Sequence, residues 1–262
     1  MTKLIVTASA ILMSLLSFSQ VSENRNVSDF SKLKASHGIE VSYTVSNTKS
    51  VKVETDDNEK MKFIKTEVEG STLKIFVDSG DGNYKSSKKG KGKRTINGIR
   101  FSVLKVTVSG PSLQAIKASS SADIKIQNAN TANNVDIEVS SSGSISGKFN
   151  CDKIDIDASS SGNFKGDIDA KNVAVESSSS ADVHLNGKTE KLTVKSSSSS
   201  TCDADKLIAD DVVATASSSA DINLYVQNSL NAKASSSGDI NYKGNPSQVT
   251  KDQSSSGSVN HK

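Results

Sequence analysis

The side chains best suited to chemistry are the hydroxyls of a recurring Ser triplet, together with the Asp and His residues that follow one copy of it. Ser180, Asp182 and His184 combine a nucleophile, a carboxylate and a base in one short segment. Alternate side chains on a strand lie roughly 6.6 Å apart, which is too far for a hydrogen-bonded Ser–His–Asp triad. The other two His residues, His37 and His261, are far away in the chain. The sequence therefore predicts no catalytic residue and no enzyme.

Metal binding is the second chemistry to consider. Calcium takes six to eight oxygen ligands, whereas each repeat offers one position for Asp, and half of the repeats carry another residue there. The two cysteines, Cys151 and Cys202, have no metal-ligand spacing to other residues. We therefore expect neither a metal nor a cofactor.

The Ser triplet recurs eight times in the second half of a chain of 262 residues. Its last Ser falls, at nearly constant intervals, at Ser121, Ser142, Ser161, Ser180, Ser199, Ser219, Ser237 and Ser256. A fixed period indicates one structural unit per repeat, stacked on the next. Residues before the triplets alternate in polarity, as Leu192, Thr193 and Val194 do, which is typical of half-buried strands. These patterns predict an all-β fold, a parallel β-helix or solenoid with coils of about 19 residues.

Continuing this alternation through the triplet predicts that its middle Ser points inward. The members of this inward set are Ser120, Ser141, Ser160, Ser179, Ser198, Ser218, Ser236 and Ser255. Each hydroxyl would bond to its neighbours in adjacent coils, since a buried hydroxyl without a partner costs about 1–3 kcal/mol. Ala or Gly follows every triplet except the one before Ser200, so we expect a thin interior.

The same alternation places the last Ser of each triplet, and the residue two positions later, on the outer surface. These candidate binding residues are Ser121, Asp123, Ser142, Ser144, Ser161, Asn163, Ser180, Asp182, Ser199, Thr201, Ser219, Asp221, Ser237 and Asp239. One interpretation is structural, because hydroxyls keep a flat sheet soluble. The other is functional, a repeated hydrogen-bonding strip for a glycan or another extended partner. An ice-binding strip is a weaker alternative, because Thr would suit that role better than Ser.

Residues 20–109 lack the triplet, but alternating runs at 39–45, 51–55, 64–68, 73–77 and 101–108 predict further β-strands. These strands either extend the solenoid or form a separate region. Residues 84–94 are rich in Lys and lack apolar periodicity, which predicts a basic loop. That loop is either simply solvated or contacts anionic polysaccharide or lipid headgroups. The expected organisation is a signal peptide at 1–19, a β-strand region at 20–109 and Ser-rich repeats at 110–262.

Residues 1–19 carry Lys3, a largely apolar run at 4–16 and then Ser17, Phe18 and Ser19 before Gln20, the pattern of a secretory signal peptide. We therefore expect an exported protein in the periplasm, at the outer membrane or outside the cell, with no transmembrane segment after cleavage. Cys151 and Cys202 lie at different points of the coil and about three repeats apart, roughly 14 Å along the axis. A disulfide needs Cα atoms within about 7 Å. The sequence therefore predicts two free thiols, with Cys202 buried.

The net charge of +3 and the few aromatic residues in the basic loop argue against a nucleic-acid partner. The last repeat ends soon after its Ser triplet. The final coil is then incomplete, and it needs a cap, a partner subunit or a frayed end. A homo-oligomer, end to end or side by side, is one expected outcome.

Several segments, in their order along the chain, resemble a known family. They are residues 30–41, with Gly38 before Ile39, then 51–55, 66–75 and 106–116, which lead into the first Ser repeat. This order resembles the putative auto-transporter adhesin, head GIN domain family of exported bacterial proteins, often from Bacteroidetes. The resemblance covers nearly all of residues 25–262. It implies a parallel β-helix-like fold and a suspected adhesive role, and it supplies no catalytic or ligand residues.

Two functions from different classes follow. The first is a non-catalytic adhesion module that presents the Ser/Asp strip to glycans or to envelope surfaces. The second is a structural or partner-dependent cell-envelope protein that has no ligand of its own and pairs with other envelope proteins. The nearly constant spacing of the triplets leaves no inserted loop that could build a catalytic cleft.

Overall fold

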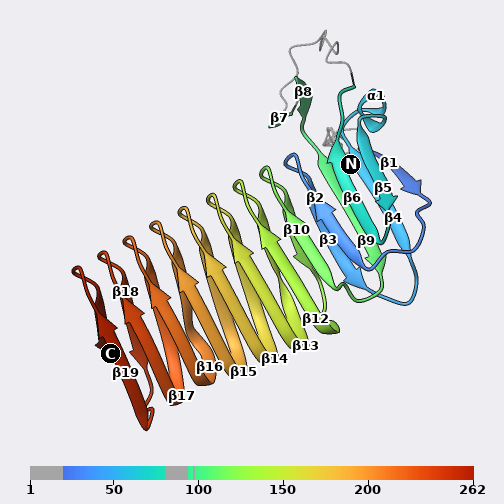
Figure 1. Cartoon of the computed structure of the whole chain (residues 1–262). Coiled ribbons are helices and arrows are strands. Elements are labelled where there is room, and N and C mark those ends of the chain that lie inside the picture. The colour runs from blue at the N-terminus through green and yellow to red at the C-terminus, as the bar shows by residue number, and fades with distance from the viewer. Residues whose placement is uncertain (1–19, 81–93, 97) are drawn as a thin grey trace, which may run out of the picture.

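A computed structural model describes residues 20–80, 94–96 and 98–262. Most of this chain is a flattened β-solenoid whose coils lie side by side (Figure 1). Every coil supplies one strand to each of two sheets, here called sheet 1 and sheet 2, and a tight turn joins the two strands. The predicted parallel β-helix is confirmed, with coils of about 19 residues.

Sheet 1 contains the strands that precede the Ser turns. In spatial order they are β5 (Ile64–Glu69), β6 (Thr72–Val77), β2 (Lys32–Ala35), β10 (Ala115–Ala118) and β12 (Asn130–Val139), the second halves of β13 (Ser144–Ala158), β14 (Asn163–Ser177), β15 (Asp182–Ser196), β16 (Thr201–Ala216) and β17 (Asp221–Ala234), and finally β19 (Gln248–Gln253). All neighbours are parallel except β5 and β6.

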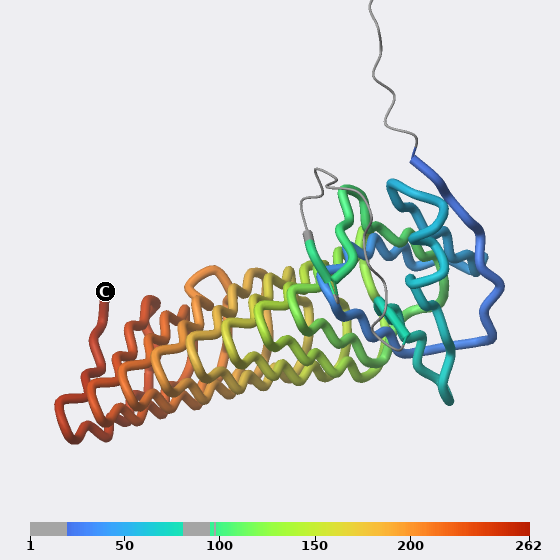
Figure 2. The backbone as a smooth tube through the Cα atoms, turned by 90° about the horizontal axis from the view of Figure 1, so that it is seen from above, coloured from blue at the N-terminus to red at the C-terminus, as the bar shows by residue number. Residues whose placement is uncertain are grey.

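Sheet 2 contains the strands that follow the turns. Its order is β1 (Val21–Arg25), β4 (Ser50–Thr55), β9 (Leu104–Gly110), β3 (Glu40–Val45), β11 (Asp123–Ile126), the first halves of β13 to β17, β18 (Asp239–Lys243) and β20 (Ser258–His261). Each of β13 to β17 bends from sheet 2 into sheet 1 at the edge opposite the turns. Figure 2 shows the resulting stack of loops, with the C-terminus at one end.

The N-terminal strands continue the same stack. Strands β2 and β3 pair in parallel with β10 and β11, although a long excursion of the chain separates the two coils. This excursion contains β4, β5, β6 and β9, the short helix α1 (Asn58–Met61) and the hairpin of β7 (Arg94–Ile96) and β8 (Ile99–Phe101). The five strands predicted in this region are present. The predicted signal peptide and nearly all of the predicted basic loop lie outside the described residues.

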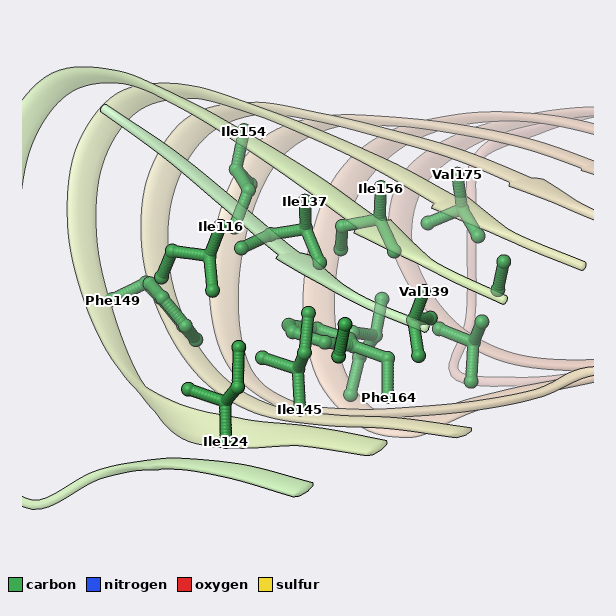
Figure 3. Packing of buried hydrophobic residues seen from close by; sticks show 14 of the residues in the cluster. Ile116, Ile124, Ile137, Val139, Ile145, Phe149, Ile154, Ile156, Phe164 and Val175 are labelled. Carbon is green, nitrogen blue, oxygen red and sulfur yellow. The ribbon is translucent and has the colours of Figure 1, made fainter. Parts of the chain in front are cut away.

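The core lies between the two sheets and is built from in-register rows. Ile116, Ile137 and Ile156 follow one another on sheet 1, and they face Ile124 and Ile145 of sheet 2 (Figure 3). Toward the C-terminus the sheet 1 row shrinks from Ile and Val to Ala214 and Ala232. The C-terminal part of this row is therefore filled by small side chains.

The C-terminal end of the core is covered by the polar side chains of the last coil. Lys251 and Gln253 stand at register positions that face inward in the preceding coils, opposite Ala232 and Ala234. The Lys251 Nζ donates to the backbone oxygen of Val259 at 3.1 Å, and the Val259 amide donates to the Gln253 Oε1 at 2.7 Å. An inward-pointing charge on an edge strand opposes pairing with another chain.

Candidate binding surface

The Ser triplets form a column of tight turns along one edge of the solenoid, here called the turn edge. In the third turn, Ser160 and Ser161 have φ angles of 50° and 60°, and the Gly162 amide donates to the Ser159 oxygen at 2.9 Å. Two consecutive left-handed residues spanned by this hydrogen bond make a type I′ turn. All eight triplets share these features. His37 and Gly38 form a ninth left-handed pair at the head of the column.

The turns are joined to each other through the backbone. The amide of the last Ser in each turn donates to the oxygen of the middle Ser in the next, for example Ser161 to Ser179 at 3.0 Å. The Gly38 amide donates to Ser120 in the same way at 2.8 Å. The column therefore repeats with the spacing of adjacent strands, about 4.8 Å.

The predicted inward ladder is wrong. The middle residues Ser120, Ser141, Ser160, Ser179, Ser198, Ser218, Ser236 and Ser255 are all exposed. Period-2 alternation holds only in extended backbone, and two left-handed residues in succession reverse the chain instead.

Three other Ser residues are buried. The Ser177 Oγ lies 2.7 Å from the Ser196 Oγ and 3.0 Å from the Ser200 Oγ, and the Ser200 hydroxyl also donates to the Ser177 backbone oxygen. These three replace Ala or Gly in the interior of two adjacent coils.

The fourteen candidate residues come together as two adjacent rows. The last Ser of each triplet is exposed on the turn edge. The residues two positions later form the first outer row of sheet 2, in which Asp123, Ser144, Asn163, Asp182 and Thr201 are direct neighbours. Asp221 and Asp239 continue this row, and the Ser258 Oγ donates to Asp239. We call these residues the Ser/Asp row.

The turn edge offers many hydrogen-bonding groups. Among the residues that the structure describes, the sixteen hydroxyls of the middle and last Ser residues have no hydrogen-bond partner, nor do the amides of the middle Ser. Each coil therefore presents two hydroxyls and one amide to solvent, and the next coil repeats them one strand away. This arrangement suits a long partner with regularly spaced polar groups.

The geometry gives no support for catalysis at Ser180, Asp182 and His184. Ser180 lies in a turn, while the His184 Nδ1 faces Asp203 of the neighbouring strand at 3.8 Å. Within the described residues, no group of three or more His, Cys, Asp or Glu side chains could hold a metal ion.

Both cysteines are free, as predicted. Cys202 is buried in a row between Val183 and Ile222, where burial and the nearby Asp203 raise its pKa to about 12. Cys151 is half-buried, and its pKa is raised to about 11 by burial and by two neighbouring carboxylates. Both shifts favour the protonated thiol at neutral pH, which is the less nucleophilic form.

The outer face of sheet 1 is a second polar surface, which the sequence analysis missed. It is hollowed by a concavity of about 610 Å³ and by another of about 400 Å³, and Asp157 and Glu176 line both. In β2, β10 and β12 its Lys, Asp and Glu residues alternate with buried apolar ones. That alternation shows that they point outward, but their grouping depends on which strands are neighbours.

No helix in the described part of the chain has the length and apolar character needed to span a bilayer.

Known proteins share this architecture. A crystal structure of a putative lipid binding protein from Parabacteroides distasonis ATCC 8503 is 25% identical, with a TM-score of 0.79 over 93% of this chain and 96% of that one. A putative adhesin from Bacteroides fragilis NCTC 9343 is 23% identical, with a TM-score of 0.62 over 93% and 97%. Another putative adhesin, from Parabacteroides distasonis ATCC 8503, is 18% identical, with a TM-score of 0.80, and the match covers 93% of this chain and 97% of that one. No curated protein matches the chain.

A family model matches the sequence at residues 29–167 and again at 148–246, which together span most of the solenoid and the strands before it. The chain therefore belongs to the family described as putative auto-transporter adhesin, head GIN domain.

Proposed function

We propose that this protein is an exported, non-catalytic binding module whose turn edge and Ser/Asp row hold an extended, hydroxyl-rich partner such as a glycan. The observation that carries this proposal is the set of sixteen exposed Ser residues in left-handed backbone whose hydroxyls make no internal hydrogen bond.

Turn geometry alone does not account for these Ser residues. A left-handed conformation costs an L-residue roughly 1–2 kcal/mol, and Asn-Gly forms a type I′ turn at lower cost. The repeated choice of Ser therefore favours a role for the hydroxyls themselves. Strained backbone that persists across a fold is often associated with a functional site.

The chemistry of the surface favours a sugar over an acyl chain. The turn edge presents hydroxyls and amides, and the adjoining row presents carboxylates, amides and hydroxyls. Each contact would be weak, but a polymer would meet many coils at once, and linked weak contacts can raise apparent affinity by 10²–10⁴. The family's description as adhesins and the adhesin relatives agree with such a role.

The test is binding of the purified protein to an array of bacterial and host glycans and peptidoglycan fragments. A variant should change the last Ser of five turns to Asn, at Ser142, Ser161, Ser180, Ser199 and Ser219. Asn tolerates left-handed backbone, so the turns should persist while the hydroxyls are lost. The control replaces hydroxyl side chains of sheet 1 by Asn outside the turn edge, at Thr215 and Thr250.

We expect saturable binding that weakens at least tenfold in the turn variant and is unchanged in the control. Binding that the two variants lose equally, or the absence of saturable binding by the unmodified protein, would reject the proposal.

A further inference from the structure

One row of side chains on the outer face of sheet 1 carries charges in an unusual order. Strand register makes each member the direct neighbour of the next. The row runs Glu67, Lys74, Lys34, Lys117, Glu138, Asp157, Glu176, Lys195 across β5, β6, β2, β10, β12, β13, β14 and β15. We call it the charge row. Three cations stand together, and then three anions stand together.

Such blocks are unfavourable within one chain, because like charges stack about one strand spacing apart. The strain shows at Asp157, whose pKa is raised by burial and by the carboxylates of Glu138 and Glu176 on either side, against an opposing effect of Lys117. Two ion pairs lower this repulsion at the ends of the acidic block: Glu138 pairs with Lys117, and Glu176 pairs with Lys195 at 2.9 Å. The two block centres, Lys34 and Asp157, form no salt bridge within the described part of the chain.

When the charge row is read in the opposite direction, every positive charge takes the place of a negative one and every negative charge the place of a positive one. Counting outward from the boundary between β10 and β12, the first position on each side pairs Lys117 with Glu138, and the second pairs Lys34 with Asp157. The third pairs Lys74 with Glu176, and the fourth pairs Glu67 with Lys195. In the neighbouring outer row only the second positions carry opposite charges, Lys32 and Asp155, while its first positions hold Ala115 and Asp136.

We propose that this face binds a second copy of the same chain in a two-fold symmetric dimer, in which the long axes of the two solenoids run antiparallel. The symmetry axis lies between the two faces, parallel to the strands, at the boundary between β10 and β12. Each copy's Lys34 then meets the partner's Asp157, so both unpaired block centres gain a counter-ion. A two-fold axis along the solenoid would instead place the basic block of one copy against the basic block of the other, and likewise the two acidic blocks. Charge repulsion therefore favours the antiparallel arrangement.

The size of the face indicates a transient dimer. Eight strands and an outward stretch of about four residues cover about 500 Å² on each copy. A total near 1,000 Å² is at the lower limit for specific interfaces and typical of transient ones. The concavity of about 610 Å³, which Lys34, Lys74 and Asp157 help to line, leaves room for the long Lys side chains of the partner. Exposed ion pairs weaken with salt, so the dimer should depend strongly on ionic strength.

Sedimentation velocity on the purified protein at 50 µM tests this, in about 20 mM and about 500 mM NaCl, where the Debye length falls severalfold. We expect a dimer at low salt and a monomer at high salt. The variants Lys34→Glu and Asp157→Lys should each be monomeric at low salt, because each homodimer would contain two like-charge contacts. An equimolar mixture of the two variants should dimerise again, because the carboxylate introduced at position 34 then meets the ammonium introduced at position 157.

The mixture also controls for folding, because a misfolded variant could not restore association. The variant Lys165→Glu makes the same charge change on the outer face of sheet 2 and should dimerise like the unmodified protein. A monomer at low salt, a mixture that stays monomeric, or a Lys165→Glu variant that loses the dimer would each overturn the proposal.

Discussion

The buried hydroxyl cluster of Ser177, Ser196 and Ser200 permits a quantitative test of how the core is held together. The three side chains are exposed by 3%, 3% and 1%. Ser177 is the centre, because its hydroxyl bonds to both of the others, whereas the Ser196 hydroxyl bonds, among the residues that the structure describes, to Ser177 alone. Ser200 keeps a second bond to the Ser177 backbone oxygen at 3.0 Å.

These contacts predict an order of costs. Ser177→Ala leaves the buried Ser196 hydroxyl without a partner, which should cost about 1–3 kcal/mol. Ser196→Ala leaves Ser177 bonded to Ser200, so the expected loss is smaller, about 0.5–1 kcal/mol. The triple change to Ala removes every buried hydroxyl together, and replacing all partners by apolar groups is close to neutral. The neighbouring coils already carry Ala at equivalent positions, as at Ala158 and Ala216.

The assay is urea unfolding of the four proteins followed by circular dichroism, with equal slopes required before midpoints are compared. Ser178→Ala, a half-buried residue outside the cluster, serves as the matched control and should change stability by less than about 0.5 kcal/mol. The reasoning fails if the triple variant is as unstable as Ser177→Ala, or if Ser196→Ala costs more than Ser177→Ala.

Three further changes have expected outcomes. Replacing Ser160 by Asn and Ser161 by Gly should raise the stability by about 1 kcal/mol in urea unfolding, because this pair adopts the left-handed turn at lower cost; an unchanged midpoint would mean that the Ser turn carries no strain. In about 500 mM NaCl, where the unmodified protein should be monomeric, Lys251→Val should cause concentration-dependent association in light scattering, since it removes the inward charge that protects the last edge; a variant that stays monomeric would contradict this. Asp157→Asn should be more stable than the unmodified monomer at pH 7, because the raised pKa means that ionised Asp157 destabilises the fold. That gain should shrink as the pH falls through the raised pKa, and a constant difference from pH 7 to pH 3 would count against the argument.

The repeat period and the alternation around it were sufficient to predict the solenoid. Parallel in-register stacking needs one coil per period, and each coil needs alternate apolar residues to fill a core between two sheets. The same pattern placed the Ser/Asp row correctly on the surface, because Asp182 and its equivalents lie in extended backbone after the turn. Cys202 was also placed correctly, in a row otherwise filled by Val and Ile.

The inward ladder failed at the residues where the backbone leaves the extended conformation. Ser179 follows Ser177 at an even spacing, yet Ser177 is buried and Ser179 is exposed. A signal for the turn was available, since a small residue follows every triplet. That residue packs against the backbone of the preceding coil: a Cβ added to Gly162 would come within 2.5 Å of the Val139 oxygen. A small residue at a fixed place after three polar ones indicates a tight bend at least as strongly as it indicates a thin core.

The charge row could not have been found from the sequence, because its basic half joins strands that are distant in the chain. Lys34 and Lys117 are neighbours only because β2 pairs with β10 after a long excursion, and Lys74 joins them through β6. Single-sequence patterns show which residues point outward, but not which strands become neighbours across an excursion.

The two proposed surfaces reinforce each other through symmetry. A two-fold axis parallel to the strands preserves strand direction, and every sheet 1 strand of the repeats runs into a Ser turn. Both turn edges of an antiparallel dimer therefore lie on the same side, as two parallel columns of hydroxyls. A polymer held by one column would find the second at high effective concentration, so dimerisation should raise the apparent affinity without any new contact. The monomeric Lys34→Glu variant, with an intact turn edge, should consequently bind an immobilised glycan more weakly at low salt, and equimolar Asp157→Lys should restore that binding. If the mixture restores the dimer but not the glycan affinity, the two surfaces act independently.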